Sequence, residues 1–336
     1  MNILLIGMGF YQYEKEMVKT LEEMGHSVKL VYDAPKAAVS HSTIINKRIR
    51  NLLIERHQDK IAKELSTRNV DRVIVIVGRY LTENFLDRIK RDHPHAKLSL
   101  YLWDDIGRIE NYYETSAFYD SIYSFDPEDC RRYGLQFLPL FYIDGYKYKK
   151  SCHKQPLIVS AFFMHSDRMQ IARNLLKDNN IPAKIIVVAG LRRWIIWNAN
   201  KAEKREDLEK GIRVRMNSIP VEEAADLVNG ATAVLDIQHP TQRGLTMRTF
   251  ETLASQTKLI TTNNTIRYYD FYNADNIEII EREKPELPEG FIGKPYKPVP
   301  QNIVDKYSLK QWMSTLLGGE LKTYLNEMNP YGIKGE

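Results

Sequence analysis

Residues 233–263 read AVLDIQHPTQRGLTMRTFETLASQTKLITTN and contain a strand, a loop, a helix and a second strand in succession. The apolar run Ala233–Ile237 predicts a buried strand, because it is short and continuous. A helical pattern covers Thr246–Ser255, and the next apolar strand is Lys258–Thr261. Strands that alternate with helices are typical of a parallel sheet. This stretch therefore predicts an α/β fold.

The same alternation extends over the whole chain in two series of predicted strands. The first series is Asn2–Ile6, Val28–Tyr32, Val73–Val77, Leu98–Trp103 and Ser121–Phe125. The second series is Leu157–Phe162, Lys184–Val188, Ile212–Met216, Ala233–Ile237 and Lys258–Thr261. We therefore expect two α/β domains.

The lysine-rich stretch Lys147–Gln155 has no apolar periodicity and separates the two series, so we place the domain boundary near residue 150. The expected domains are residues 1–150 and 151–320, with a tail at 321–336. The Pro- and Gly-rich segment Glu283–Pro300 predicts an extended connection, and Leu309–Leu317 predicts a helix that packs back across the domains.

Composition limits the class of protein. The 336 residues carry 48 Lys and Arg against 43 Asp and Glu, a small excess that argues against an obligate nucleic-acid binder. The only cysteines are Cys130 and Cys152, too few for a disulfide framework, which suits a reducing compartment. The N-terminus lacks the pattern of a signal peptide, and no run approaches the roughly 20 apolar residues that cross a bilayer. We expect a cytoplasmic protein whose membrane contact, if any, is peripheral.

The first predicted strand ends in the glycine-containing turn Gly7–Gln12, where a dinucleotide fingerprint would need a third glycine at Gln12. We therefore favour a tight strand-to-helix turn over a pyrophosphate site.

A second polar segment of this half is Trp103-Asp104-Asp105, at the carboxyl end of a predicted strand. One carboxylate is a candidate general base, because burial beside Trp103 would raise its pKa. The alternative is that one aspartate caps the following helix and the other is solvated.

Two further polar segments follow strands of the second series. In the turn His165–Arg168, the helix N-terminus favours a phosphate, and His165 and Arg168 can add charge-assisted bonds. The alternative is a simple helix cap with a surface histidine. In the other segment, Arg243, Arg248 and Glu251 fall in or next to one crevice, where arginines suit a diphosphate and a glutamate suits ribose hydroxyls. The alternative is a solvated pair of Arg248 and Glu251.

The chain resembles the GT-B glycosyltransferases, and more closely the bacterial capsule and lipopolysaccharide transferases related to the CgeB group. The resemblance rests on GLTMRTFETLA with KLITTN, within residues 244–263. It is supported by Trp103-Asp104-Asp105, by YSFDPED at 123–129 and by Leu138-Pro139. These motifs are spread over nearly the whole chain in family order.

The resemblance implies two Rossmann-like domains facing across a cleft, with the acceptor on the N-terminal domain and a nucleotide-sugar donor on the C-terminal one. Glu251 matches the ribose-binding glutamate, and Asn217-Ser218-Ile219 matches the segment that meets the base. The implied contacts near the diphosphate come from the turn 165–168 and from the long motif. They are His165, Arg168, Arg243, Gly244, Thr246 and Arg248. Retaining relatives have a sugar-binding glutamate eight residues before the ribose glutamate, but here that residue is Arg243, so stereochemistry does not carry over.

These observations predict a glycosyltransferase without an essential metal or cofactor. Candidate catalytic residues are Asp104, Asp105 and His165. A nucleotide-sugar epimerase or hydrolase, or a non-catalytic glycan-binding protein, would share this architecture. The segment 40–66 contains apolar residues at helical spacing among many basic ones, which suits contact with an anionic leaflet. The alternative is a helix that covers the first sheet and has a solvated basic face.

Overall fold

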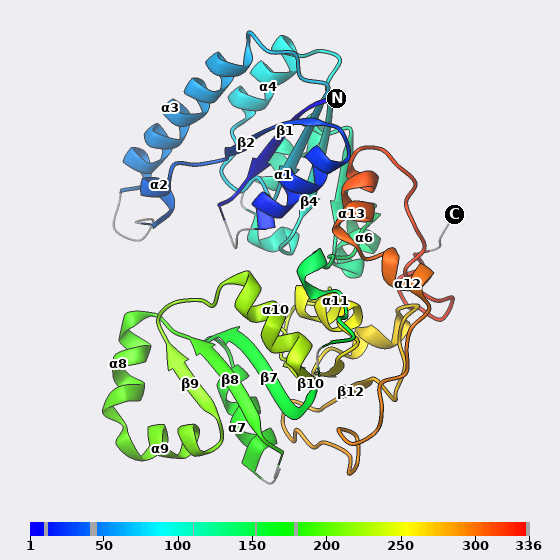
Figure 1. Ribbon diagram of the computed structural model, residues 1–336. Helices are drawn as coiled ribbons and strands as arrows, with labels where there is room; N and C mark the ends of the chain where they lie inside the picture. The colour runs from blue at the N-terminus through cyan, green and yellow to red at the C-terminus, as the bar shows by residue number, and fades with distance from the viewer. Residues whose placement is uncertain (10–12, 41–45, 110, 152, 178–180, 334–336) are drawn as a thin grey trace. The chain divides into compact units, whose positions relative to one another are not determined.

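The computed structural model describes residues 1–9, 13–40, 46–109, 111–151, 153–177 and 181–333. Within them, the chain forms two compact units, each built on one parallel six-stranded sheet (Figure 1). Unit 1 comprises Met1–Pro139, Leu309–Thr323 and Tyr331–Glu336. Unit 2 comprises Leu140–Ser308 and Tyr324–Pro330. The predicted α/β class with two sheets is confirmed.

The sheet of unit 1 has the order β2-β1-β3-β4-β5-β6. Its strands are β1 (Asn2–Gly7), β2 (Ser27–Tyr32), β3 (Arg72–Ile76), β4 (Lys97–Leu102), β5 (Ser121–Ser124) and β6 (Gln136–Phe137). The chain turns to opposite sides after β1 and after β3, so the strand order reverses between these two strands. Ligands of open α/β sheets bind beyond the carboxyl ends of strands at such a position. The five predicted strands of this half are present, and the two-residue β6 is too short to give a periodic pattern.

The helices of unit 1 cover both faces of its sheet. They are α1 (Tyr13–Glu23), α2 (Lys36–Ser40), α3 (Lys47–Leu65), α4 (Glu83–Asp92), α5 (Tyr112–Thr115), α6 (Pro127–Tyr133) and α13 (Leu309–Leu316). Helix α1 packs with α13, and α3 packs with α4. Helix α4 begins where Thr82 caps its N-terminus, since Thr82 Oγ1 accepts a hydrogen bond from Phe85 N at 3.3 Å. Its buried residues Phe85, Leu86 and Ile89 then form one apolar stripe.

The sheet of unit 2 has the order β12-β11-β10-β7-β8-β9. Its strands are β7 (Gln155–Phe163), β8 (Ala183–Val188), β9 (Ile212–Arg215), β10 (Ala231–Asp236), β11 (Lys258–Thr261) and β12 (Ile277–Ile279). The order reverses between β7 and β10, which places the expected ligand position at the carboxyl ends of these neighbouring strands. The five predicted strands of the second series are present, and β12 is an additional edge strand.

The helices of unit 2 lie between these strands or, in the case of α12, after the last of them. They are α7 (Arg168–Lys177), α8 (Leu191–Ala199), α9 (Lys201–Glu209), α10 (Val221–Gly230), α11 (Met247–Ala254) and α12 (Gln301–Asp305). Short 3₁₀ turns occur at Ile106–Arg108, Ser116–Phe118, Asp144–Tyr146 and Asn264–Tyr268. The segment 283–300 contains neither helix nor strand, as the prediction of an extended connection requires.

The structure divides the chain at Pro139, about ten residues before the boundary expected from the lysine-rich stretch. Residues 140–150 belong to unit 2, because Tyr142 N donates to Tyr307 O at 2.9 Å and Tyr148 N donates to Ala254 O at 2.9 Å. Tyr142 and Tyr146 are also almost completely buried. The lysine-rich stretch is therefore a surface segment of unit 2 and not a linker between the units.

The second difference concerns α13, which the expected range 151–320 assigned to the C-terminal domain. The structure places Leu309–Thr323 in unit 1. Ser99 Oγ donates to Leu316 O at 3.1 Å, and the rings of Tyr101 and Trp312 lie 4.5 Å apart. The apolar face of α13 is thus buried against strand β4, which the residue range by itself could not indicate. The tail expected at 321–336 is likewise shared between the two units.

The turn after β1 is described only as far as Gly9, and Gln12 lies outside the described residues. Gly9 has a φ of +73°, and its N–H donates to Glu14 Oε1 at 3.1 Å. The buried Glu14 carboxylate therefore occupies a position that an anionic ligand would need.

Among the described residues, none of the helices is both long enough and apolar enough to cross a bilayer.

Candidate functional site

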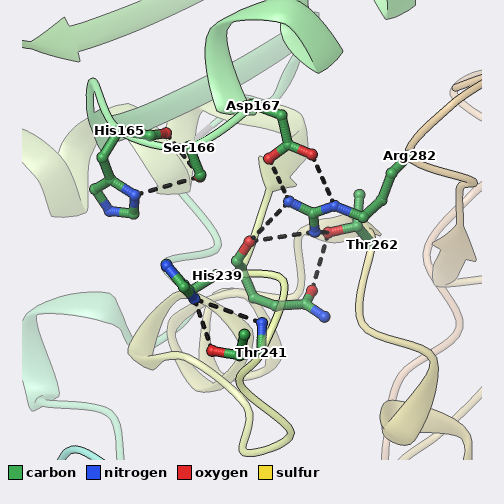
Figure 2. Close-up of polar contacts among 8 residues, drawn as sticks. His165, Ser166, Asp167, His239, Thr241, Thr262 and Arg282 are labelled. Atoms are coloured by element: carbon green, nitrogen blue, oxygen red, sulfur yellow. Dashed lines mark hydrogen bonds and ion pairs between the residues drawn. The ribbon is translucent and has the colours of Figure 1, made fainter. Parts of the chain in front are cut away.

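The loops that follow β7, β10, β11 and β12 meet at one edge of the unit 2 sheet and are joined by Arg282 (Figure 2). Arg282 Nε and Nη2 donate to the two carboxylate oxygens of Asp167 at 3.0 and 2.6 Å. Its Nη1 donates to Gln238 O at 3.2 Å and to Thr262 Oγ1 at 3.0 Å. One guanidinium therefore fixes the relative positions of loops from four strands. The Arg282 guanidinium also lowers the pKa of Asp167.

The turn 165–168 lies at the reversal point of strand order, as its place after β7 predicts. Ser166 has a φ of +49°, a left-handed conformation that is uncommon for a residue with a Cβ. His165 Nδ1 lies 3.3 Å from Ser166 Oγ, and the His165 ring lies 5.8 Å from the ring of His239, which follows β10. The structure thus brings two imidazoles together at the sheet edge, with the N-terminus of α7 beside them.

Arg248 and Glu251 form a close pair on α11. Arg248 Nη1 lies 2.6 Å from Glu251 Oε2. The side chain of Arg248 is 20% exposed, whereas that of Glu251 is 1% exposed. The alternative of a solvated pair is therefore wrong, because the carboxylate is buried. The Tyr146 hydroxyl also contacts both side chains, and burial raises its pKa.

Asp236 is the last residue of β10 and lies beside this pair. Its Oδ2 accepts from Thr246 Oγ1 at 2.7 Å, which ties the strand end to the first residue before α11. Burial raises the pKa of Asp236, and the charges of Arg168 and Arg248 oppose that rise. Arg168 begins α7, so these electrostatic interactions link residues from two helices and one strand. We refer to Arg168, Asp236, Arg248 and Glu251 as the donor cluster.

The donor cluster combines two guanidinium groups with two carboxyl groups. One of these carboxyl groups, that of Glu251, pairs with Arg248. A diphosphate would compete for the arginines by offering several anionic oxygens to their planar donor groups. The N-termini of α7 and α11 add backbone N–H donors and the positive ends of helix dipoles. The arrangement is suited to a ligand that carries both phosphates and hydroxyl groups.

The remaining predicted residues of the long motif form the approach to α11. Thr246 occupies the N-cap position of α11. Arg243 is exposed, and its backbone O accepts from Asn263 Nδ2 at 3.1 Å and from Thr265 Oγ1 at 2.8 Å. Gly244 O accepts from Asn263 Nδ2 at 3.3 Å. Side chains after β11 therefore fix the backbone that carries Arg243.

The predicted base-binding segment Asn217-Ser218-Ile219 lies in the loop between β9 and α10. Asn217 and Ser218 are exposed, and Ser218 O accepts from Arg215 Nη2 at 3.5 Å. The loop lies at the same sheet edge as the donor cluster, but β9 is two strands from β7. The structure thus separates this segment from the donor cluster along the edge.

In unit 1, the two candidate aspartates differ in their contacts. Asp104 Oδ2 lies 2.8 Å from Arg79 Nη2, and burial raises the Asp104 pKa while Arg79 opposes the rise. Asp105 Oδ1 accepts from Gly107 N at 2.9 Å and therefore caps the turn Ile106–Arg108. Of the two readings left open for this pair, capping describes Asp105, and Asp104 remains the candidate base.

Sequence reasoning missed Asp33, Asp236 and Arg282. Asp33 follows β2, and burial raises its pKa to about 6 although Tyr80 N donates to it and Arg79 lies near. Asp33 and Asp236 are polar residues at the carboxyl ends of strands, the same signal that selected Asp104. Arg282 follows the short strand β12, which was not predicted, so no sequence signal placed it at the site. The described residues contain no group of three or more His, Cys, Asp or Glu that could hold a metal.

The chain has the GT-B fold, with two Rossmann-like α/β units, and solved structures share it over nearly their whole length. Anabaena HepE in complex with UDP has a TM-score of 0.59 at 10% identity, covering 95% of this chain and 100% of that chain. The UDP-forming α,α-trehalose-phosphate synthase from Burkholderia vietnamiensis has a TM-score of 0.59 at 9% identity, covering 95% and 99%. AviGT4, a glycosyltransferase involved in avilamycin A biosynthesis, has a TM-score of 0.54 at 12% identity, covering 97% and 99%.

These likenesses confirm the predicted GT-B fold. No protein-family model matches the sequence, and no curated protein matches it. At such low identity, the similarity is one of fold, so the activity has to be argued from the residues of the site.

Proposed function

We propose that this protein is a glycosyltransferase that moves a sugar from a nucleotide-sugar donor to a glycan or lipid-linked acceptor in bacterial surface polysaccharide synthesis. The observation that carries the proposal is the donor cluster at the reversal point of the unit 2 sheet, in which Arg248 pairs with Glu251 and the charges of Arg168 and Arg248, from separate helices, act on Asp236. Support also comes from the solved structures, since HepE is described in complex with UDP and with UDP-glucose. UDP is therefore the first nucleotide to test.

In this proposal, unit 2 binds the donor. Arg168, Arg243 and Arg248 contact the diphosphate, with Gly244 and Thr246 forming the backbone next to it. Glu251 accepts hydrogen bonds from the ribose hydroxyls, which requires Arg248 to shift its contacts from Glu251 to the phosphates. The loop of Asn217, Ser218 and Ile219 contacts the base. Arginines and helix N-termini that are already in place stabilise the charge that grows on the departing diphosphate.

The acceptor is assigned to unit 1. During transfer, the bond between the anomeric carbon and the diphosphate oxygen breaks and a bond to the acceptor oxygen forms. The proton of the acceptor hydroxyl passes to a base, for which we propose Asp104, and His165 supports the departing diphosphate. No metal or cofactor is required in this scheme, because the arginines supply the positive charge. We place the protein in the cytoplasm, with the segment 40–66, of which residues 41–45 lie outside the described residues, contacting the anionic inner face of the plasma membrane.

The test is thermal unfolding of the full chain with UDP, GDP, CDP, CMP, ADP or dTDP, each with magnesium and with a chelator. A nucleotide that binds the native state raises the unfolding midpoint by mass action. We expect one nucleotide to raise the midpoint equally under both conditions. A shift that depends on magnesium would contradict the metal-free scheme, and no shift with any nucleotide would contradict the donor site.

A second assay separates transfer from related reactions. We expect the matching nucleotide sugar to release nucleotide faster when an acceptor glycan is present. Full-rate conversion of the donor without an acceptor would instead indicate an epimerase or hydrolase. Binding without release of nucleotide under any condition would indicate a non-catalytic glycan-binding protein.

A further inference from the structure

Helix α8 exposes an unusual group of large aliphatic side chains. It reads LRRWIIWNA, and Leu191, Ile195 and Ile196 are 62%, 52% and 58% exposed. Single exposed apolar residues are common, but several gathered on one short helix mark an interaction surface. With about 100° between successive residues of a helix, these three side chains fall within an arc of about 140°. They therefore form one patch.

The opposite face of α8 is firmly held. Trp197 is 7% exposed, and Trp194 packs against the core of unit 2. Trp197 Nε1 donates to Asp207 Oδ2 at 2.7 Å, and Arg173 Nε donates to Asp207 Oδ1 at 2.8 Å. Helices α8 and α9 lie beside strand β9 (Figure 1). The buried Trp197 and the partly buried Trp194 thus hold one face of the helix against unit 2 and leave the aliphatic side chains on the outer face.

The patch is also basic. Arg192 and Arg193 are exposed, and neither forms an ion pair within the described part of the chain. Residues 191–202 contain no Asp or Glu. The acidic residues of the neighbouring α9 all pair with other cations, in the pairs Glu203–Arg173, Asp207–Arg173, Glu206–Lys210 and Glu209–Arg205. The two arginines are therefore available to an external anion.

We propose that Leu191, Arg192, Arg193, Ile195 and Ile196, the α8 surface, dock unit 2 on an anionic lipid bilayer. The aliphatic side chains enter the boundary between headgroups and acyl chains, and the arginines bind lipid phosphates. Charge complementarity favours this partner, because the patch joins apolar residues to cations in a segment without carboxylates. The α8 surface is independent of sugar transfer and shares only its lipid partner with the contact proposed for residues 40–66.

The position of α8 in unit 2 would bring the donor cluster close to the membrane. Strand β8 ends at Val188, and α8 begins at Leu191, so the N-terminus of α8 lies at the sheet edge that carries the donor cluster. Docking through α8 would hold this edge near the leaflet. A lipid-linked molecule would then meet unit 2 at the membrane surface.

The test is sedimentation of the full chain with phosphatidylcholine vesicles prepared with or without phosphatidylglycerol. We expect binding only to the anionic vesicles. Ile195→Ser with Ile196→Ser should weaken binding about tenfold or more, through loss of buried aliphatic surface. Arg192→Gln with Arg193→Gln should weaken it by a similar factor and reduce its salt dependence.

The matched control is Met328→Ser, whose side chain is 79% exposed and lies outside both the α8 surface and residues 40–66. This control should bind anionic vesicles as the wild type does. The proposal would be overturned if the wild type did not bind anionic vesicles, or if the α8 variants bound them as strongly as the wild type. It would also be overturned if the isoleucine variant turned a dimer into a monomer in light scattering with vesicle binding unchanged. The nucleotide-induced shift of the unfolding midpoint should be the same in all variants, which keeps this test separate from that of the donor site.

Discussion

Arg248 Nη1 lies 2.6 Å from Glu251 Oε2, three residues along α11, and the carboxylate is buried beneath the partly exposed guanidinium. The pair places an anion-binding group above the residue proposed to bind ribose. In the proposed donor complex the phosphates would bind Arg248 and the ribose would bind Glu251, so the donor would engage both members of the pair.

Glu251→Gln should lower kcat/KM by about 10- to 100-fold, because a hydrogen bond to a charged group is replaced by a weaker neutral one. Glutamine is used because alanine would leave Arg248 facing a cavity. Steady-state kinetics with the matching nucleotide sugar measures the effect. The control is Glu209→Gln, which breaks the exposed pair with Arg205 and should leave kcat/KM unchanged. Equal activity of both variants would contradict the role of Glu251.

Asp104→Asn should lower kcat by about 100-fold or more if Asp104 is the general base. The nucleotide-induced rise of the unfolding midpoint should be unchanged, because donor binding is assigned to unit 2. Asp105→Asn is the matched control, since Asp105 caps the turn that includes Gly107 and pairs with Arg108. A larger loss of kcat in the Asp105 variant would exchange the two assignments.

Arg282→Lys should weaken nucleotide binding by about tenfold, because lysine cannot bridge both oxygens of Asp167 while holding Gln238 and Thr262. The loop next to the donor cluster would then lose its fixed position. Isothermal titration with the matching nucleotide measures the dissociation constant. Arg131→Lys, which alters an exposed pair with Glu128 on α6, should have no effect. An unchanged affinity in the Arg282 variant would limit Arg282 to a structural role.

Asp33→Asn should stabilise the protein at neutral pH but not at acidic pH. The folded-state pKa of Asp33 is raised from 3.8 to about 6 by burial, so the folded state retains a proton that the unfolded state has lost. The free energy of unfolding of the wild type therefore falls by on the order of 3 kcal/mol as pH rises from the unfolded-state pKa through the folded-state pKa. The neutral variant does not lose this stability. Urea unfolding from pH 4 to pH 8 measures the difference.

Asp71→Asn provides the control of opposite sign. The Asn2 N–H donates to Asp71 Oδ2 at 2.7 Å and holds the pKa of Asp71 below its usual value. Stability from that bond is present above the unfolded-state pKa and is lost on acidification. The free energy of unfolding of the Asp71 variant should therefore be lower than that of the wild type at neutral pH, and the difference should disappear on acidification. A pH-independent difference between wild type and the Asp33 variant would show that Asp33 is not the titrating group.

The candidate site was predictable from the sequence where its residues are local to one loop or helix. The i, i+3 spacing of Arg248 and Glu251 places them on one helix face without any tertiary information. The carboxyl-edge rule for open sheets selected Asp104 and the turn at His165 in the same way. Asp236 obeys that rule, but its electrostatic interactions with Arg168 and Arg248 depend on the packing of β10 against β7.

The α/β class and ten of the strands were predictable from the sequence alone, because hydrophobic periodicity and helix signals are local properties of the chain. The position of α13 in unit 1, the positions of Tyr142 and Tyr146 in unit 2 and the pairing of Arg282 with Asp167 depend instead on tertiary packing. Each of these contacts joins residues far apart in sequence. Their positions follow from burial of apolar faces and pairing of charges across strands, which no local pattern encodes.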